Sequence, residues 1–151
     1  KDVHPFGNDT DLVYKTDESK CIPNSPDAEG VSVGLNCYNP ALIYIASFGK
    51  NILLGVNNYV PGTYEEYVRE VAEYDKKIYG NDYDLIEFIK LSGHNAAHLV
   101  YQTNNKLVKN EQYIVELSSN KILNINSHYY LKYESDVPPI FQKIISSLRF
   151  N

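Results

Sequence analysis

Apolar residues recur with the period of an α-helix in two segments of this chain. In the first segment they fall at intervals of three and four residues, at Tyr64, Tyr67, Val68, Val71, Tyr74 and Ile78. Thr63 precedes this stripe, and Glu66 stands three residues after Thr63. This spacing is typical of a capping box at a helix N-terminus. Gly80 is a typical C-terminal residue because glycine adopts a left-handed conformation easily. We therefore expect a helix over Thr63–Tyr79.

The second helical segment lies close to the C-terminus. Its apolar stripe consists of Val137, Ile140, Phe141, Ile144, Ile145 and Leu148. Asp136 stands where an N-cap is expected, and Pro138 and Pro139 fall in the first turn, where a missing N–H group costs little. The pattern predicts a helix over Asp136–Leu148 that packs on a sheet face.

Short runs of alternating apolar and polar residues elsewhere predict β-strands. Before the first helix we expect strands from Val31 to near Pro40, over Ala41–Phe48 and over Ile52–Val60, the last two joined in a hairpin through Gly49-Lys50-Asn51. After that helix, the expected strands are Asp84–Leu91, Asn95–Thr103, Leu107–Leu117 and Lys121–Tyr130. Their connections are too short for parallel crossovers, which indicates an antiparallel meander. The predicted fold class is α+β, with an antiparallel sheet of about five to seven strands and both helices packed on it.

Length and charge narrow the range of possible proteins. A chain of 151 residues is expected to form one domain with its own core. Residues 1–30 are polar, and only Leu12-Val13-Tyr14 suggests a short strand there, so we expect an irregular N-terminal arm before a single domain over residues 31–151. The net charge of −5, without a basic cluster, argues against a nucleic-acid partner. No segment approaches the roughly 18 apolar residues of a transmembrane helix.

The first residue and the cysteines bear on the compartment of the protein. The chain begins at Lys1 and contains no methionine, so we expect that a signal peptide or membrane anchor was removed, or that the chain was shortened. Cys21 and Cys37 supply only two of the roughly four ligands of a structural zinc site. They are either two buried thiols of a cytosolic protein or one disulfide of an extracytoplasmic protein. We predict the Cys21–Cys37 disulfide.

Several local features, taken in order, resemble the PsbP-like family, which is named for an extrinsic subunit of photosystem II. They are the strand Asn51-Ile-Leu-Leu-Gly-Val, the helix beginning Thr63-Tyr-Glu-Glu-Tyr, the Leu-Ser-Gly-His-Asn-Ala-Ala-His-Leu-Val-Tyr unit around Gly93, and the closing Ile-Ser-Ser-Leu-Arg-Phe150. The resemblance covers residues 41–151. It does not extend to the aromatic-Pro-x-x-Trp stretch of many family members, because only Cys37-Tyr38-Asn39-Pro40 stands nearby and the chain has no tryptophan. The resemblance implies a PsbP-like sandwich with a non-enzymatic, extracytoplasmic accessory or binding role.

The histidines are the first candidates for chemistry. His94 and His98 are four residues apart, and on a strand two such residues share a face but lie about 13 Å from each other. They are therefore more simply a turn histidine and a surface or cross-strand histidine than a chelating pair. His128 could approach either one, with Glu111 or Glu116 as an added carboxylate, and a metal site of this kind is the minor alternative. We predict no metal and no cofactor.

No catalytic arrangement stands out in the sequence. It contains no Gly-x-Ser-x-Gly motif, and the carboxylate pairs Glu65 and Glu66, and Asp82 and Asp84, are more simply helix-cap and loop residues. We predict no catalytic residues and a protein that is not an enzyme. The alternatives are a small secreted hydrolase of unrecognised type and a cystatin-like or NTF2-like ligand-binding module.

The chain contains 14 tyrosines, and these suggest two different roles. Tyrosine combines apolar area with a polar tip, which suits a binding surface, but it also replaces phenylalanine and tryptophan as a core aromatic. The tyrosines of the predicted helix and sheet are Tyr64, Tyr67, Tyr74, Tyr101, Tyr113, Tyr129, Tyr130 and Tyr133. The sequence thus predicts an extracytoplasmic binding domain, with a tyrosine-lined face as its candidate surface, for a protein or small-molecule partner that the sequence does not identify.

Overall fold

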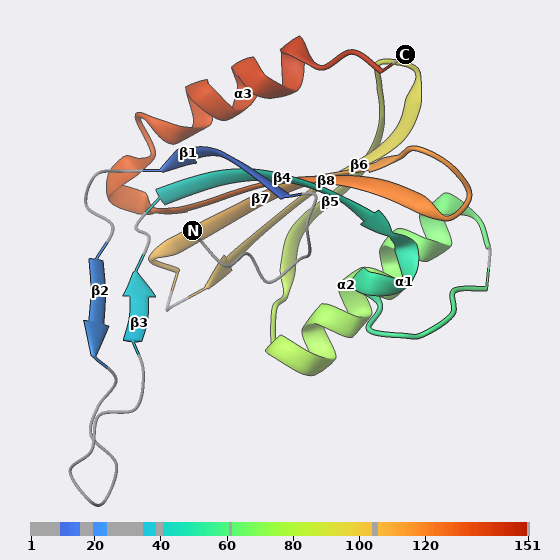
Figure 1. The fold of residues 1–151 in the computed structure, drawn as a ribbon, viewed down its shortest axis with the longest axis horizontal. Coiled ribbons are helices and arrows are strands. Elements are labelled where there is room, and N and C mark those ends of the chain that lie inside the picture. Colours follow the sequence, from blue (N-terminus) through green and yellow to red (C-terminus); the bar gives the residue numbers. More distant parts are fainter. Residues whose placement is uncertain are drawn as a thin grey trace, which may run out of the picture.

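The computed structural model in Figure 1 describes residues 41–60, 62–103 and 106–150, together with the backbone of three strands at 10–15, 20–23 and 35–38. Six antiparallel strands form the main sheet in the order β1-β4-β8-β7-β6-β5. Their bounds are β1 Thr10–Lys15, β4 Ala41–Gly49, β5 Tyr83–Leu91, β6 His94–Thr103, β7 Val108–Glu116 and β8 Lys121–Tyr130. The predicted antiparallel α+β architecture and the meander from β5 to β8 are confirmed.

The helices cover opposite faces of this sheet (Figure 1). The α2 face is covered by α2 (Tyr64–Tyr79) and the α3 face by α3 (Val137–Ser147), while α1 (Lys50–Leu53) and the 3-10 helix η1 (Leu131–Tyr133) are short. Side chains alternate between the two faces along each strand. In β7, for example, Ile114 lies in the apolar cluster under α2, whereas Tyr113 and Val115 lie in the cluster under α3.

The predicted N-terminus of α2 is confirmed in detail. The Thr63 hydroxyl oxygen accepts a hydrogen bond from the Glu66 backbone N–H at 3.2 Å, and the Glu66 carboxylate accepts one from the Thr63 N–H at 2.8 Å. Gly80 ends the helix with φ +71°. The predicted stripe is buried from Tyr64 to Val71, but it ends before Ile78, whose side chain is 52% exposed.

The predicted helix at the C-terminus is present, but its cap is not the one expected. Asp136 stands at the N-cap position of α3, yet its side chain accepts no hydrogen bond from the helix backbone. An N-cap side chain normally accepts from the second or third helical N–H. In α3 these positions are Pro138 and Pro139, which have no N–H group to donate.

The predicted strand Ile52–Val60 and its hairpin with Ala41–Phe48 are wrong. The chain leaves β4 into α1 and a turn, where Gly55 has φ +62° and the Val56 N–H donates to the Asn51 carbonyl at 3.1 Å. Both edges of β4 are occupied by β1 and β8, so no edge is left for a hairpin partner. The apolar residues of this segment have two different environments. Three pack on the α2-face cluster, namely Leu53, Leu54 and Tyr59. Three are exposed, namely Ile52, Val56 and Val60.

The N-terminal strands lie partly where the sequence suggested an arm. Leu12-Val13-Tyr14 falls within β1, which pairs with β4 in the main sheet. β2 (Lys20–Pro23) and β3 (Leu35–Tyr38) form a separate two-stranded sheet. The start of the strand expected from Val31 lies outside the described residues, and the division of the chain at residue 31 stays a prediction. None of the described helices combines the length and apolar character that a membrane span requires.

Candidate functional site: a polar groove beside a buried ion pair

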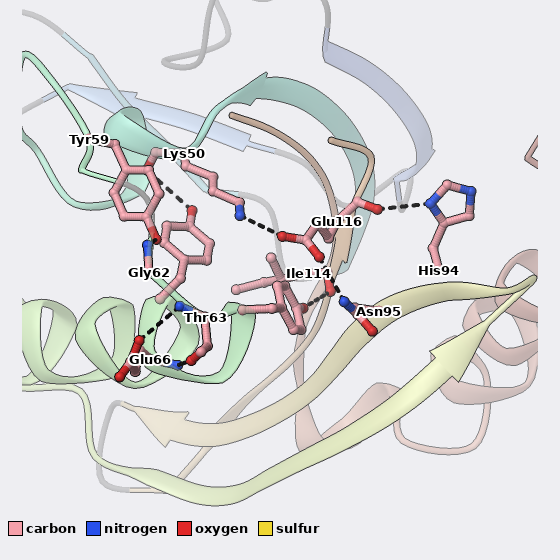
Figure 2. A network of polar contacts seen from close by, with 11 residues as sticks. Lys50, Tyr59, Gly62, Thr63, Glu66, His94, Asn95, Ile114 and Glu116 are labelled. Atoms are coloured by element: carbon pink, nitrogen blue, oxygen red, sulfur yellow. Dashed lines mark hydrogen bonds and ion pairs between the residues drawn. The ribbon is translucent and has the colours of Figure 1, made fainter. Parts of the chain in front are cut away.

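A buried lysine lies where β4 gives way to α1. Lys50 is only 2% exposed, and its Nζ lies 2.6 Å from Oε1 of Glu116, the last residue of β7 (Figure 2). The rings of Tyr59, Tyr64 and Tyr67 surround the ammonium group, with centroids 5.5, 6.0 and 5.2 Å from Nζ. Aromatic faces attract a cation, and this attraction strengthens when water is excluded. The ammonium is therefore held by one carboxylate and three rings.

Hydrogen bonds continue from this pair toward the protein surface. Oε2 of Glu116 accepts from Nδ2 of Asn95 at 2.8 Å, and Oδ1 of Asn95 accepts from Nζ of Lys90. Burial raises the pKa of the Glu116 carboxyl, but the hydrogen bonds from Lys50 and Asn95 outweigh burial, and the pKa lies below its usual value. Glu116 is therefore charged at neutral pH, with both of its oxygens engaged.

Two tyrosines of α2 tie the helix to this network. The Tyr67 hydroxyl donates to the Lys50 backbone carbonyl at 3.2 Å, and the Tyr64 hydroxyl donates to the Ile114 carbonyl. Burial is the main cause that raises the pKa of both phenols, so both remain protonated donors. Both tyrosines lie in the first turns of α2, and their hydroxyls join the helix to the backbone of Lys50 and of Ile114 in β7.

A groove of about 460 Å³, open to solvent, lies directly beside the ion pair. One wall comes from the turn between β5 and β6, where Ser92 and Gly93 both have positive φ, and the other from the turn between β7 and β8. Positive φ at both central residues is the conformation of a tight hairpin turn that matches the twist of its strands. The groove is lined by Lys90, Gly93, His94, Asn95, Glu116, Leu117, Ser118 and Ser119.

His94 stands at the groove with one ring nitrogen committed. Nδ1 lies 2.9 Å from the backbone oxygen of Glu116, and a carbonyl oxygen can only accept, so we assign the Nδ1 proton to this bond. In the neutral ring Nε2 then carries the lone pair. The ring of Phe150 packs edge-on against His94, with centroids 5.0 Å apart. His94 thus joins the groove to the C-terminal segment.

The structure does not bring the predicted histidines together. As expected, His94 and His98 lie on one strand, β6, where Nε2 of His98 lies 2.8 Å from Oε1 of Glu111. His128 lies on the other face, with Nδ1 2.8 Å from Oδ1 of Asn110, and burial lowers its pKa. Among the described residues, no group of three His, Cys, Asp or Glu side chains could hold a metal ion.

Four of the eight tyrosines named for the candidate surface are core aromatics, so a face formed by the whole set is not present. Tyr67 and Tyr129 are fully buried, and Tyr64 and Tyr113 are only 5% and 6% exposed. The remaining members of the set are half-buried: Tyr74, Tyr101, Tyr130 and Tyr133. Three tyrosines nevertheless serve the site indirectly, as the rings around the Lys50 ammonium.

Sequence reasoning missed most of the site. It placed Lys50 in an exposed hairpin turn and gave no role to Lys90, Asn95, Ser118 or Ser119. A local signal was present only in the two tight turns, since Ser92-Gly93 and Ser118-Ser119-Asn120 both mark hairpins. The meander brings those turns to the same end of the sheet, and this is where the groove lies.

Comparison with known proteins places the fold. No protein-family model and no curated protein matches the sequence. Among solved structures, the chain is similar to PA94 from Pseudomonas aeruginosa, a protein of unknown function, with a TM-score of 0.59 and 13% identity over 95% of this chain and 99% of that one. It is also similar to cyanobacterial PsbP (CyanoP) from Synechocystis sp. PCC 6803, with a TM-score of 0.50 and 12% identity over 97% of this chain and 96% of that one. The predicted PsbP-like resemblance is thus confirmed at the level of the fold.

Proposed function

We propose that this chain is a non-enzymatic, extracytoplasmic binding domain of the PsbP-like type, and that its ligand binds in the groove beside the Lys50–Glu116 pair. The observation that carries the proposal is the groove itself, whose polar side chains are held in place from a buried ion pair. A site whose side chains are ordered before binding loses less conformational entropy when a ligand arrives. The groove is open, so part of the ligand stays in solvent.

The extracytoplasmic setting is supported by the cysteine strands. In the pairing of β2 with β3, Cys21 lies directly opposite Cys37. Opposed residues of antiparallel strands have Cα atoms about 4.5–5.5 Å apart, which falls within the disulfide range of about 4.4–6.8 Å. We therefore propose the Cys21–Cys37 disulfide, which requires an oxidising compartment.

Thiol titration tests the disulfide. Protein isolated from its natural compartment, then denatured without reductant, is expected to show no free thiol, and two thiols would reject the bond. Reduction is expected to lower the free energy of unfolding by about 3 kcal/mol, because the bond closes a loop of about 15 residues in the unfolded chain. The Cys21→Ser, Cys37→Ser double variant, which should not respond to reductant, is the control.

A ligand screen with a blocked groove tests the binding role. Ser119→Tyr places a ring in the groove at an exposed position, and Ser146→Tyr on the exposed side of α3 is its matched control. At least one compound of a small-metabolite library is expected to raise the melting temperature of the wild type and of Ser146→Tyr, but not of Ser119→Tyr. A compound that stabilises all three proteins equally binds elsewhere and contradicts the site. Conversion of the bound compound into a product would contradict the non-enzymatic role and favour the hydrolase alternative.

A further inference from the structure

The donors and charges of the groove point to the chemistry of its ligand. We infer, on the basis of the proposed function, that the groove binds the anionic group of a small molecule, either a phosphate or a carboxylate. The inference rests on three features of the lining: unused hydrogen-bond donors, one uncompensated positive charge, and a side-chain order that reaches from the interior to the surface.

Several hydrogen-bond donors of the groove side chains have no partner among the described residues. An ammonium group has three N–H donors, and Lys90 uses one of them on Oδ1 of Asn95, so two remain. Ser118 and Ser119 are exposed in the opposite wall and add a hydroxyl each. Glu116, the carboxylate of the lining, has both oxygens engaged by Lys50 and Asn95. The groove therefore offers donors to an acceptor-rich group.

Charge favours the same class of ligand. The buried Lys50 ammonium neutralises the Glu116 carboxylate at 2.6 Å, which leaves Lys90 as the cation of the lining without an ion pair among the described residues. Lys90 also attracts the Glu116 carboxylate, and the formal charges of Lys50, Lys90 and Glu116 sum to one positive charge. An anion gains a charge-assisted hydrogen bond from Lys90, which is stronger than the bond that a neutral acceptor makes there.

A series of polar contacts connects the Lys90 side chain to the interior of the protein. Lysine has a flexible stem, and an exposed lysine is normally spread over many rotamers. Here the Lys90 ammonium is bound to Asn95, Asn95 is bound to Glu116, and Glu116 is bound to a lysine that is 2% exposed. This series of contacts connects the Lys90 ammonium, at the groove, to the interior of the protein.

Titration with simple anions tests the inference. Backbone amide shifts of ¹⁵N-labelled protein are followed against sodium phosphate and, separately, sodium citrate, with sodium chloride holding the ionic strength constant. We expect saturable shifts at Asn95, Ser118 and Ser119 with at least one of the two anions. A saturable response to phosphate alone, or to citrate alone, identifies which anionic group the groove binds. The Lys90→Gln variant keeps a polar amide beside Asn95. It is expected to bind the anion at least about tenfold more weakly than the wild type.

Lys143→Gln, an exposed lysine of α3, is the matched control and is expected to bind like the wild type. Shifts that stay linear with concentration, or that are equal in all three proteins, overturn the inference. If Lys90→Gln does not fold, Lys90→Arg replaces it and is expected to retain binding within about threefold of the wild type, because the charge is kept. If no anion saturates while a neutral compound from the screen is lost in Ser119→Tyr, the anion inference fails and the proposed function stands. If neither binds, both fail.

Discussion

Strand β7 carries two carboxylates, the partly exposed Glu116 and the buried Glu111, that face opposite sides of the sheet and differ in their partners. Glu116 lies on the α2 face and forms an ion pair with the ammonium group of Lys50. Glu111 lies on the α3 face, where Oε1 is 2.8 Å from Nε2 of His98 and 3.3 Å from Nε2 of Gln142. Histidine carries a charge only when it is protonated. One face therefore encloses a fixed ion pair, whereas the other holds a carboxylate whose partners can all be neutral.

The partners of the two carboxylates also differ in how far they are exposed to solvent. The Lys50 side chain is 2% exposed, while the His98 side chain is 16% exposed and has a second carboxylate, Glu87, at 3.9 Å. Removal of one partner therefore has different consequences on the two faces. On the α2 face, removal of Glu116 leaves the Lys50 ammonium buried without a counter-charge. On the α3 face, removal of Glu111 leaves a partly exposed imidazole.

The largest effect is expected from Glu116→Gln. The substitution leaves the Lys50 ammonium buried without a counter-charge, and breaking a buried pair in this way lowers the free energy of unfolding by about 3–5 kcal/mol. Urea unfolding at pH 7 measures it. Lys50→Met is expected to cost less, because Glu116 is partly exposed and keeps its bond to Asn95. The double variant is expected to recover part of the loss, and strictly additive effects would show that the pair is not coupled.

The same pair sets a direction for acid sensitivity. The folded-state pKa of Glu116 lies below its unfolded value of 4.5, so its stabilisation is complete above pH 4.5 and is lost as the pH falls through the folded-state pKa. Wild type is therefore expected to lose more stability between pH 7 and pH 3 than Glu116→Gln, which has no carboxyl to protonate. Parallel losses in urea unfolding at the two pH values would contradict this role of Glu116.

A smaller effect is expected from Glu111→Gln on the α3 face. The amide oxygen can still accept from His98 and Gln142, so the substitution weakens two hydrogen bonds but strands no permanent charge. The expected loss is about 1–2 kcal/mol at pH 7 by urea unfolding. A loss equal to that of Glu116→Gln would show that His98 carries a full charge in the folded protein, and the contrast between the two faces would then fail.

The parts of this protein that the sequence predicted are those governed by local chemistry. The capping box of α2 depends on residues three positions apart, and the strands from β5 to β8 depend on alternation within each strand. The wrong strand at Ile52–Val60 has a distant cause, because β1 and β8 occupy both edges of β4. Nothing near Ile52 in the sequence reports that occupancy.

The candidate site was hidden for the same reason. Lys50 meets Glu116 from 66 positions away, and each residue alone has the pattern of an ordinary surface charge. The tyrosines were ambiguous because their burial depends on which layer covers them, and α2 and α3 together cover both faces. The histidine spacing predicts that His94 and His98 share a strand, which β6 confirms. Their separate partners, Glu116 and Glu111, depend on the register of β6 and β7, which the spacing does not contain.

The smallest effects are expected at the two helix N-termini, where the helices that cover the two faces begin differently. Thr63→Ala removes the hydroxyl that accepts from the Glu66 N–H, and the loss of such a cap lowers stability by about 1 kcal/mol. Asp136→Ala is its counterpart on α3, and its effect is expected to stay within about 0.5 kcal/mol, because Pro138 and Pro139 offer no N–H for the carboxylate to accept. Urea unfolding of both variants at pH 7 measures the difference. Equal losses would show that Asp136 stabilises α3 through the helix dipole rather than through a hydrogen bond, and high salt would then reduce its contribution but leave that of Thr63 unchanged.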